Sequence, residues 1–185
     1  MVIERQRMTI ERFERFVTLP ENAGRVFELV DGELVEKMPT EEHGFFILVI
    51  GGRLLTFVNQ HKLGWVTTDA RHRLPKDKEN AFRPDISHIS FARKQEIIRQ
   101  GAVPLMPDLA VEIQSPDDSA NRMRLKAIYY LNNGSQLVWL VFPNKRQIEI
   151  WTPNGELHTL SIDDMLEGDD VLPGFTLPLR EIFQV

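Results

Sequence analysis

The sequence predicts a mixed α/β fold of the α+β type, in which helices cover a mixed β-sheet and an N-terminal β-hairpin precedes it. Short stretches typical of strands are interleaved with two longer stretches of helical spacing. With 185 residues and 42% hydrophobic content, the chain can bury one core and is short for two. Pro and Gly stand singly between periodic segments, without a linker or repeat. We therefore expect residues 1–185 to form a single domain.

The N-terminal segment predicts a short helix followed by a β-hairpin. Thr9 is a candidate N-cap for a helix over residues 10–16. Two strands, residues 27–30 and 33–38, flank the dipeptide Asp31-Gly32. Asp-Gly between two apolar stretches is a strong signal for a two-residue hairpin turn.

The core elements are expected in the order helix, three strands, helix, strand. Apolar side chains recur every four residues from Phe46 to Val58, which predicts a helix from Thr40 to near Gly64. The other expected core elements are strands over residues 65–74, 82–91 and 109–114, a helix over 120–131 that the turn 115–119 caps, and a strand over 136–142. This order suits a mixed sheet with helices on its faces.

Three further segments lie outside that core order. Residues 92–100 predict a short surface helix that Gly101 stops, and residues 147–152 predict another strand. Residues 168–183 are rich in apolar side chains for a free tail, so we expect them to pack as a cover. The side chains expected to do so are Val171, Leu172, Phe175, Leu177, Leu179 and Phe183.

The composition excludes several classes of protein. The formal net charge of −5 makes the whole molecule no polycation, so any nucleic-acid site must be local. The absence of cysteine excludes disulfides, thiolate catalysis, iron–sulfur clusters and cysteine-based zinc sites. No apolar run approaches the ~20 residues that span a bilayer, and the first residues lack a signal-peptide core. We expect a cytoplasmic protein without a membrane segment.

A carboxylate stands in the most apolar strand of the sequence. The stretch 109–114 is apolar on both faces apart from Glu112 and Gln114, as in a central strand that helices cover. Burying the Glu112 carboxylate is costly unless a cationic side chain, a metal ion or a raised pKa compensates. A structural salt bridge at the strand end is the alternative interpretation.

Asp85, which follows Pro84, offers a complementary signal on the preceding strand. Taken alone, Asp85 reads as a turn or cap residue. Adjacent strand ends would bring Asp85 and Glu112 together, where two carboxylates repel unless a cation lies between them. Mg²⁺, or Mn²⁺ in its place, suits such an oxygen-only site, with water and phosphate as the remaining ligands.

Arg83-Pro84-Asp85, followed on the next expected strand by Glu112-Ile113-Gln114, resembles the PD-(D/E)XK nuclease signature. Further matching features are Glu28 to Glu33, His43, Val111 to Pro116, Lys126, and Leu137 to Pro143. Together they resemble the Uma-two family of restriction-endonuclease-like proteins, abundant in cyanobacteria, over nearly the whole chain. The resemblance implies a restriction-endonuclease-like αβββαβ core with an N-terminal β-hairpin.

The family resemblance also implies a function and a set of site residues. It implies a Mg²⁺-dependent endonuclease that hydrolyses phosphodiester bonds of nucleic acid, with DNA as the expected partner. Asp85 and Glu112 would be the metal ligands, and Glu28, the first acidic residue of the motif, would ligate metal or orient water. His43 would contact phosphate or transfer a proton. A homodimer fits this class, because cutting both strands often uses two sites.

The chain departs from the parent signature at one position. The lysine of the signature would stand at position 114, where this chain has Gln114, which forms hydrogen bonds but carries no charge. In the family the lysine has moved to the following helix, where Lys126 matches it, and Gln114 would be a supporting polar contact. If Lys126 is catalytic, we expect Lys126→Met to lower Mg²⁺-dependent cleavage by orders of magnitude and hardly change stability.

Each of these residues also has a structural interpretation. Lys126 lies at the edge of an apolar stripe, as a boundary lysine that covers apolar surface does. Glu28 and Glu33 read equally well as solvent-facing cross-strand residues, and a lone histidine such as His43 is more often structural. The aromatic side chains, including Tyr129 and Tyr130, are expected in the core rather than on a base.

A second function therefore competes with hydrolysis. Gln114, the acidic net charge and the lack of a DNA-reading motif favour a catalytically impaired module that binds nucleic acid or a protein partner. Charge is unevenly distributed: residues 71–99 are locally basic, whereas residues 149–185 hold eight acidic side chains and only Arg180 as a basic one. The sequence does not decide between DNA and RNA.

Overall fold

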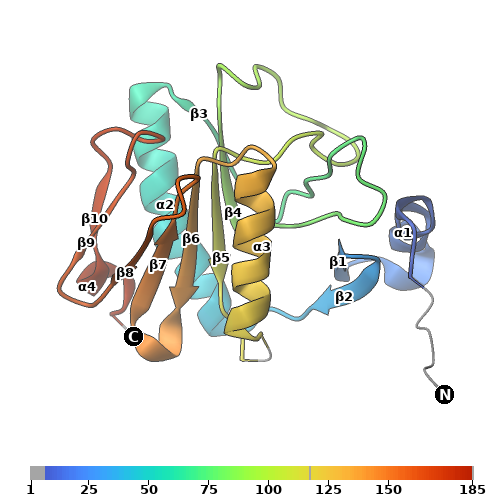
Figure 1. Cartoon of the computed structure of the whole chain (residues 1–185), viewed down its shortest axis with the longest axis horizontal. Coiled ribbons are helices and arrows are strands. Elements are labelled where there is room, and N and C mark those ends of the chain that lie inside the picture. Colours follow the sequence, from blue (N-terminus) through green and yellow to red (C-terminus); the bar gives the residue numbers. More distant parts are fainter. Residues whose placement is uncertain (1–6, 117, 185) are drawn as a thin grey trace.

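A six-stranded mixed β-sheet forms the centre of the computed structural model, which describes residues 7–116 and 118–184 (Figure 1). Its strand order is β3-β4-β5-β6-β7-β8, with β5 and β6 parallel and the other neighbours antiparallel. The strands are β3 (Gly64–Thr68), β4 (Ile86–Ser90), β5 (Leu109–Ile113), β6 (Leu137–Phe142), β7 (Gln147–Trp151) and β8 (Leu157–Leu160). Asp117 of the predicted capping turn lies outside the described residues.

One helix packs on each face of the sheet. α2 (Glu41–His61) covers one face and α3 (Ala120–Asn132) the other. The predicted core order is confirmed, because the chain runs α2-β3-β4-β5-α3-β6. Thr40 and Ser119 cap the two helices, each accepting a backbone N–H with its side-chain oxygen. Among the residues that the structure describes, no helix combines the length and apolar composition that crossing a membrane requires.

The alternation of side chains along β5 determines where Glu112 points. Leu109, Val111 and Ile113 belong to the core between the sheet and α2. Ala110 packs in the second core, with Met123, Ala127 and Tyr130 of α3. Successive side chains of a strand point to opposite faces, so Glu112, like Ala110, projects toward α3.

The predicted N-terminal hairpin is confirmed as β1 (Val26–Val30) paired with β2 (Glu33–Lys37). Asp31 and Gly32 have φ values of 48° and 74°, as the two-residue turn requires. α1 (Ile10–Val17), with Thr9 at its N-cap position, packs on one face of the hairpin against Phe27 and Leu29. A 3-10 turn, η1 (Pro20–Asn22), joins α1 to the hairpin.

The C-terminal segment covers the α2 side of the sheet. It forms β9 (Met165–Glu167) paired with β10 (Thr176–Pro178), followed by α4 (Leu179–Ile182). The predicted cover is confirmed: five of its six side chains are buried in the α2 core, and Val171 is partly buried against it. The sequence did not predict β8, which extends the sheet beyond β7 after a turn at Gly155.

The predicted surface helix over residues 92–100 is wrong. These residues form turns and bends and contain no buried side chain. The amides of Arg93 and Lys94 both bond to the Ser90 carbonyl, and the Arg93 guanidinium bonds to Asp108. A helix this short needs an apolar face to bury, and Ile97 and Ile98 remain 48% and 41% exposed.

Two predicted strands, 65–74 and 82–91, are shorter than expected. β3 ends at Thr68 because Asp69 adopts a left-handed conformation with φ of 51°. β4 begins after Pro84, which has no N–H to donate to a ladder. Between these points an isolated bridge still joins His72 and Phe82.

A buried histidine joins the long connection after β3 to the sheet. The Nδ1 atom of His72 lies 2.8 Å from the Leu105 carbonyl oxygen, and Nε2 lies 3.3 Å from Ser87 Oγ. Ser87 Oγ also bonds to Thr67 Oγ1 at 2.9 Å. A neutral imidazole that donates from Nδ1 and accepts at Nε2 satisfies this network. Burial lowers the pKa of His72 from its ordinary value of 6.5 to about 4.

We predict that this histidine weakens the fold between pH 6.5 and pH 4. Above pH 6.5 the imidazole is neutral in the folded and unfolded chains alike. As the pH falls through this window, the unfolded chain binds a proton that the folded chain does not, so the free energy of unfolding decreases by up to about 3 kcal/mol. Urea denaturation across this range should show a smaller pH dependence for His72→Gln. The control His158→Gln, at an exposed position, should show the same pH dependence of the free energy of unfolding as the parent. If His72→Gln shows that same pH dependence too, the role assigned to His72 is contradicted.

Candidate functional site

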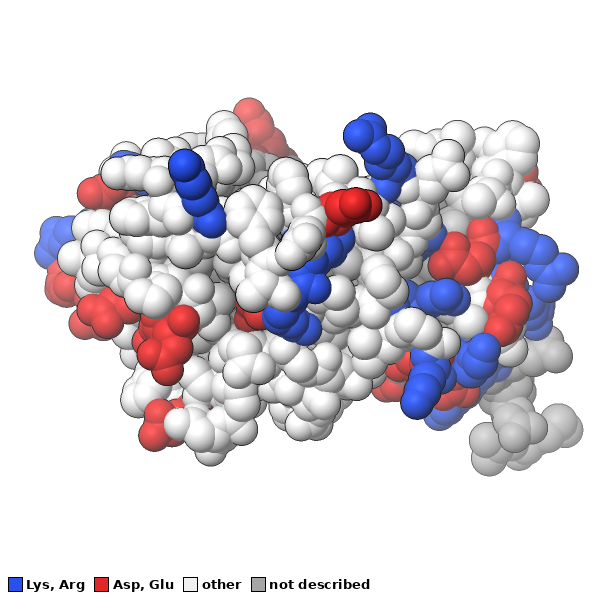
Figure 2. All heavy atoms as spheres, turned by 90° about the horizontal axis from the view of Figure 1, so that it is seen from above, with Lys and Arg blue, Asp and Glu red and all other residues white. Residues whose placement is uncertain are grey.

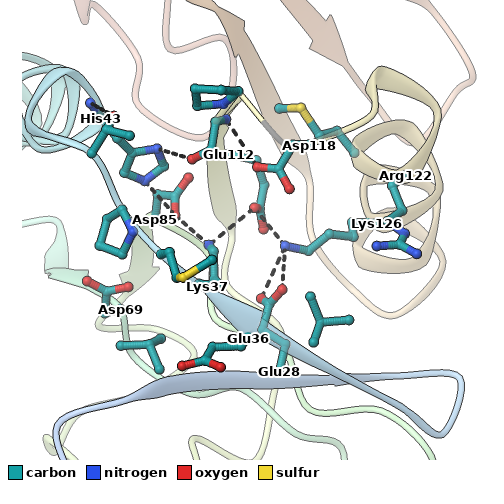
Figure 3. A pocket seen from close by; sticks show the side chains of 18 of the residues that line it. Glu28, Glu36, Lys37, His43, Asp69, Asp85, Glu112, Asp118, Arg122 and Lys126 are labelled. Carbon is teal, nitrogen blue, oxygen red and sulfur yellow. Dashed lines mark hydrogen bonds and ion pairs between the residues drawn. The ribbon is translucent and has the colours of Figure 1, made fainter.

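A pocket opens where the hairpin meets the sheet (Figure 3). Its walls come from β1 and β2, the start of α2, the ends of β4 and β5 that face the hairpin, and α3. The cavity has a volume of about 190 Å³, room for several water molecules, since one needs about 10–15 Å³. Charged side chains of β1, β2, β5 and α3 meet at its inner end, together with Asp85 directly before β4 (Figure 3).

Asp85 stands directly before β4 and is almost fully buried. β4 and β5 are antiparallel with Ile86 opposite Val111, so extending this register places Asp85 opposite Glu112. Asp85 Oδ2 accepts a 2.7 Å hydrogen bond from the Ile113 amide, which fixes the carboxylate at this edge. Asp85 Oδ1 faces the pocket, 2.6 Å from Lys37 Nζ and 3.2 Å from His43 Nε2.

Glu112 lies on β5 and is 3% exposed. Its Oε1 accepts a 2.6 Å hydrogen bond from the Tyr130 hydroxyl, and its Oε2 lies 2.7 Å from Lys126 Nζ. Both partners come from consecutive turns of α3, so the packing of this helix on the sheet places them. Lys37 Nζ lies 3.9 Å from Glu112 Oε2 on the other side.

Glu28 and Lys126 form the second half of the cluster. Glu28 points toward the pocket because its neighbours Phe27 and Leu29 point toward α1. Lys126 Nζ lies 3.1 and 3.0 Å from the two Glu28 oxygens, so this ammonium bridges Glu28 and Glu112. The Arg83 amide also donates to Glu28 Oε1 at 2.6 Å. Neither residue is solvent-facing: Glu28 and Lys126 are 3% and 9% exposed.

Sequence reasoning missed Lys37, the last residue of β2. Its ammonium lies between Asp85 and Glu112 (Figure 3). It donates a further 3.2 Å hydrogen bond to the Arg83 carbonyl. The hairpin register offered a signal. Glu28 of β1 lies opposite Val35 of β2, and Lys37 follows Val35 by two residues on β2. Residues two apart on a strand share a face, so Lys37 points to the same side as Glu28.

The remaining predicted site residues are divided between the pocket and its surroundings. His43, buried at the start of α2, contacts Asp85 and lies 3.1 Å from Ser115 Oγ through Nδ1. Gln114 does not line the pocket; its side-chain amide donates to the Asp118 carbonyl at 2.9 Å. Glu33 lies at the turn end of the hairpin, and Arg122 is 3.8 Å from it.

Burial and mutual attraction together set the charges of this cluster. Burial lowers the pKa of Lys37, but the nearby carboxylates outweigh it and leave the pKa above its ordinary value. The pKa of Lys126 is raised for the same reason. Burial raises the pKa of Asp85, yet Lys37 reverses the shift and lowers it below the ordinary value. Burial raises the pKa of Glu112, against the opposing effect of both lysines.

The donor atoms around Lys37 fit a divalent cation. Asp85 Oδ1 and Glu112 Oε2 face the same ammonium, so the space between them is already a cation position. Mg²⁺ takes oxygen ligands and is commonly held by one or two carboxylates together with water and phosphate. Within residues 7–116 and 118–184, no three acidic or histidine side chains converge to hold a metal ion by themselves. A metal here would therefore depend on solvent or substrate oxygens.

The locally basic segment 71–99 is partly engaged inside the molecule. Arg71 pairs with Glu14 at 2.8 Å, Arg93 pairs with Asp108 at 2.9 Å, and Arg83 donates to the Asp69 carbonyl at 3.0 Å. On the face shown in Figure 2, lysine and arginine side chains are interspersed with acidic ones and form no continuous basic surface.

The burial of Lys126 changes the expectation for its replacement. Lys126→Met would leave the Glu28 and Glu112 carboxylates buried without their shared ammonium. We predict that the free energy of unfolding falls by about 3–5 kcal/mol, as measured by urea denaturation.

A double-mutant cycle provides the control. Glu28→Gln removes one of the two carboxylates that the ammonium contacts, so its cost and that of Lys126→Met should not add. Lys126→Met combined with Glu28→Gln should be more stable than the sum of the single changes predicts. Additive effects would show that the 3.0 Å contact contributes nothing to stability.

Comparison with known proteins identifies the family. The Uma2 family, described as "Putative restriction endonuclease", matches residues 13–180. A crystal structure of a "putative nuclease belonging to DUF820" from Anabaena variabilis has the same fold, with a TM-score of 0.81 and 20% sequence identity over 96% of this chain and 98% of that chain. No curated protein matches the sequence. Because the match spans nearly all of the sequence, the chain belongs to the Uma2 family of restriction-endonuclease-like proteins.

Proposed function

We propose that this protein is a Mg²⁺-dependent endonuclease that hydrolyses phosphodiester bonds, with DNA as its substrate. The observation that carries the proposal is the convergence of Asp85 and Glu112, from adjacent strand ends, on one cation position inside a solvent-accessible pocket. Asp85 and Glu112 would hold the ion. When bound, Mg²⁺ supplies Lewis-acid polarisation of the phosphate.

The surrounding side chains would keep the two carboxylates in position. The Ile113 amide and His43 fix Asp85, and the Tyr130 hydroxyl fixes Glu112. Side chains whose rotamers are locked by second contacts hold a site within the tolerance that chemistry requires. His43 would also be close enough to the cleft to contact phosphate.

Lys126 would take the role of the lysine that position 114 lacks. Its ammonium contacts Glu112 at 2.7 Å and Glu28 at 3.0 Å, so it lies beside the proposed metal ligand. A cation there would orient the attacking water and balance charge that develops on the phosphate. Gln114 does not line the pocket and has no part in this proposal.

One observation favours a second candidate, a nucleic-acid-binding or protein-binding module without catalysis. Lys37 and Lys126 already neutralise much of the carboxylate charge, so the cluster is stable without a metal. If the cluster is purely structural, replacing Asp85 or Glu112 by its amide should leave the binding of nucleic acid unchanged.

An activity assay distinguishes these candidates. We predict that the parent protein cleaves double-stranded DNA with Mg²⁺ or Mn²⁺ and is inactive in EDTA. Asp85→Asn and Glu112→Gln should each lower the rate by about 100-fold or more, because each removes a charged ligand of the proposed ion.

Asp108→Asn is the matched control for the loss of a buried carboxylate. Asp108 is 7% exposed, accepts from the Ser90 amide at 2.7 Å and pairs with Arg93, outside the pocket. The cleavage rate of Asp108→Asn should stay near that of the parent, while its free energy of unfolding decreases. Full activity in Asp85→Asn would contradict the site. Binding of nucleic acid without cleavage, unchanged in both amide variants, would favour the second candidate.

A further inference from the structure

Lys37 differs from Lys126 in how it is held. Lys126 Nζ contacts both oxygens of Glu28 and one of Glu112, and α3 anchors its backbone. Lys37 Nζ bonds to Asp85 Oδ1 and the Arg83 carbonyl, and its side chain is 16% exposed where β2 ends beside the pocket. Lys37 is therefore the ammonium with fewer carboxylate contacts, and its side chain is the more exposed of the two, 16% against 10%.

The ammonium and a metal ion would compete for one position. Mg²⁺ binds oxygen ligands at about 2.0–2.1 Å, whereas Lys37 Nζ already stands 2.6 Å from Asp85 Oδ1 and 3.9 Å from Glu112 Oε2. An ion held by both oxygens would overlap the ammonium and repel its charge. The two cations therefore exclude each other.

Charge balance within the cluster leads to the same conclusion. With Glu28, Asp85 and Glu112 ionised, the three carboxylates and the two lysines leave one negative charge. Adding a divalent ion to all five groups would leave one positive charge in a buried site. Exchanging Lys37 for the ion instead leaves the cluster neutral. A neutral cluster has the lower free energy in a medium of low dielectric.

We propose that Lys37 is a displaceable counter-ion: it occupies the cation position between Asp85 and Glu112, and a divalent metal enters by expelling its ammonium toward the pocket mouth. This inference rests on the proposed function, since it uses the same metal position. Lys37 thereby stabilises the metal-free fold and lowers the affinity of the site for metal. The four-carbon stem allows the ammonium to leave without moving the hairpin.

Metal titration of Lys37 variants tests this inference without measuring activity. Isothermal titration with Mn²⁺ should show that Lys37→Met binds about tenfold more tightly than the parent, because the competing charge is gone. Lys37→Arg keeps the charge and should bind no more tightly than the parent. Lys78→Met, which removes an exposed lysine paired with Glu11 outside the pocket, should leave the affinity unchanged.

Thermal unfolding provides an independent readout. Lys37→Met should melt below the parent without metal, because Asp85 loses its counter-ion, and saturating Mn²⁺ should raise its melting temperature more than that of the parent. If Lys37→Met folds only with Mn²⁺, the ion has taken the place of the ammonium, as proposed. If it does not fold even with Mn²⁺, Lys37 is a fixed structural cation and the inference is overturned.

The two proposals fail in different ways. Equal or weaker Mn²⁺ affinity in Lys37→Met overturns the counter-ion inference, even if the parent cleaves DNA. Tighter Mn²⁺ binding that Asp85→Asn abolishes supports the inference, even if no variant cleaves nucleic acid and the nuclease proposal falls. Tighter binding that persists in the Lys37→Met/Asp85→Asn double variant would place the ion elsewhere and overturn the inference.

Discussion

Glu112 lies on β5 between the sheet and α3, where its carboxylate is 3% exposed and cannot be neutralised by its own strand. Its partners come from distant parts of the chain: Lys126 and Tyr130 from α3, and Lys37 from the hairpin. An unpaired charge at this depth would cost several kcal/mol. The hairpin adds Lys37 and Glu28 to the cluster around Glu112, beside Lys126 and Tyr130 of α3. These contacts link the N-terminal elements to the central sheet.

The parts of the fold that the sequence predicted are those with a local or periodic signal. The four-residue spacing from Phe46 to Val58 marked α2, and the Asp31-Gly32 turn marked the hairpin. Residues 92–100 show the limit of such signals, because the turn there depends on contacts with Ser90 and with Asp108, far along the chain. β8 was missed because its residues Leu157–Leu160 are mostly exposed, so no apolar pattern marks them.

The candidate site was predictable where strand order alone brings residues together. Asp85 directly precedes β4, and Glu112 lies one residue before the end of the neighbouring antiparallel strand β5, so their proximity followed from the core order. The position of Lys37 depends on how the hairpin docks, which sequence periodicity does not encode. Lys126 was ambiguous for a related reason: its ammonium contacts Glu28 of β1 as well as Glu112, and the contact with Glu28 depends on how the hairpin docks.

The energetic cost of the cluster bears on which function is the better proposal. Replacing a buried ion network by apolar side chains of similar volume is often neutral or stabilising, so stability alone gives little reason to bury charge. Here three carboxylates, two lysines and His43 gather at the inner end of a pocket rather than inside a closed core. A module that only preserved its fold would need none of the six. A charged cluster that is costly to bury and that lines a pocket is better explained by a ligand that enters the pocket and uses the charges. The proposed ligands match that arrangement. A divalent ion would bind the carboxylates, and a phosphodiester would then contact the lysines.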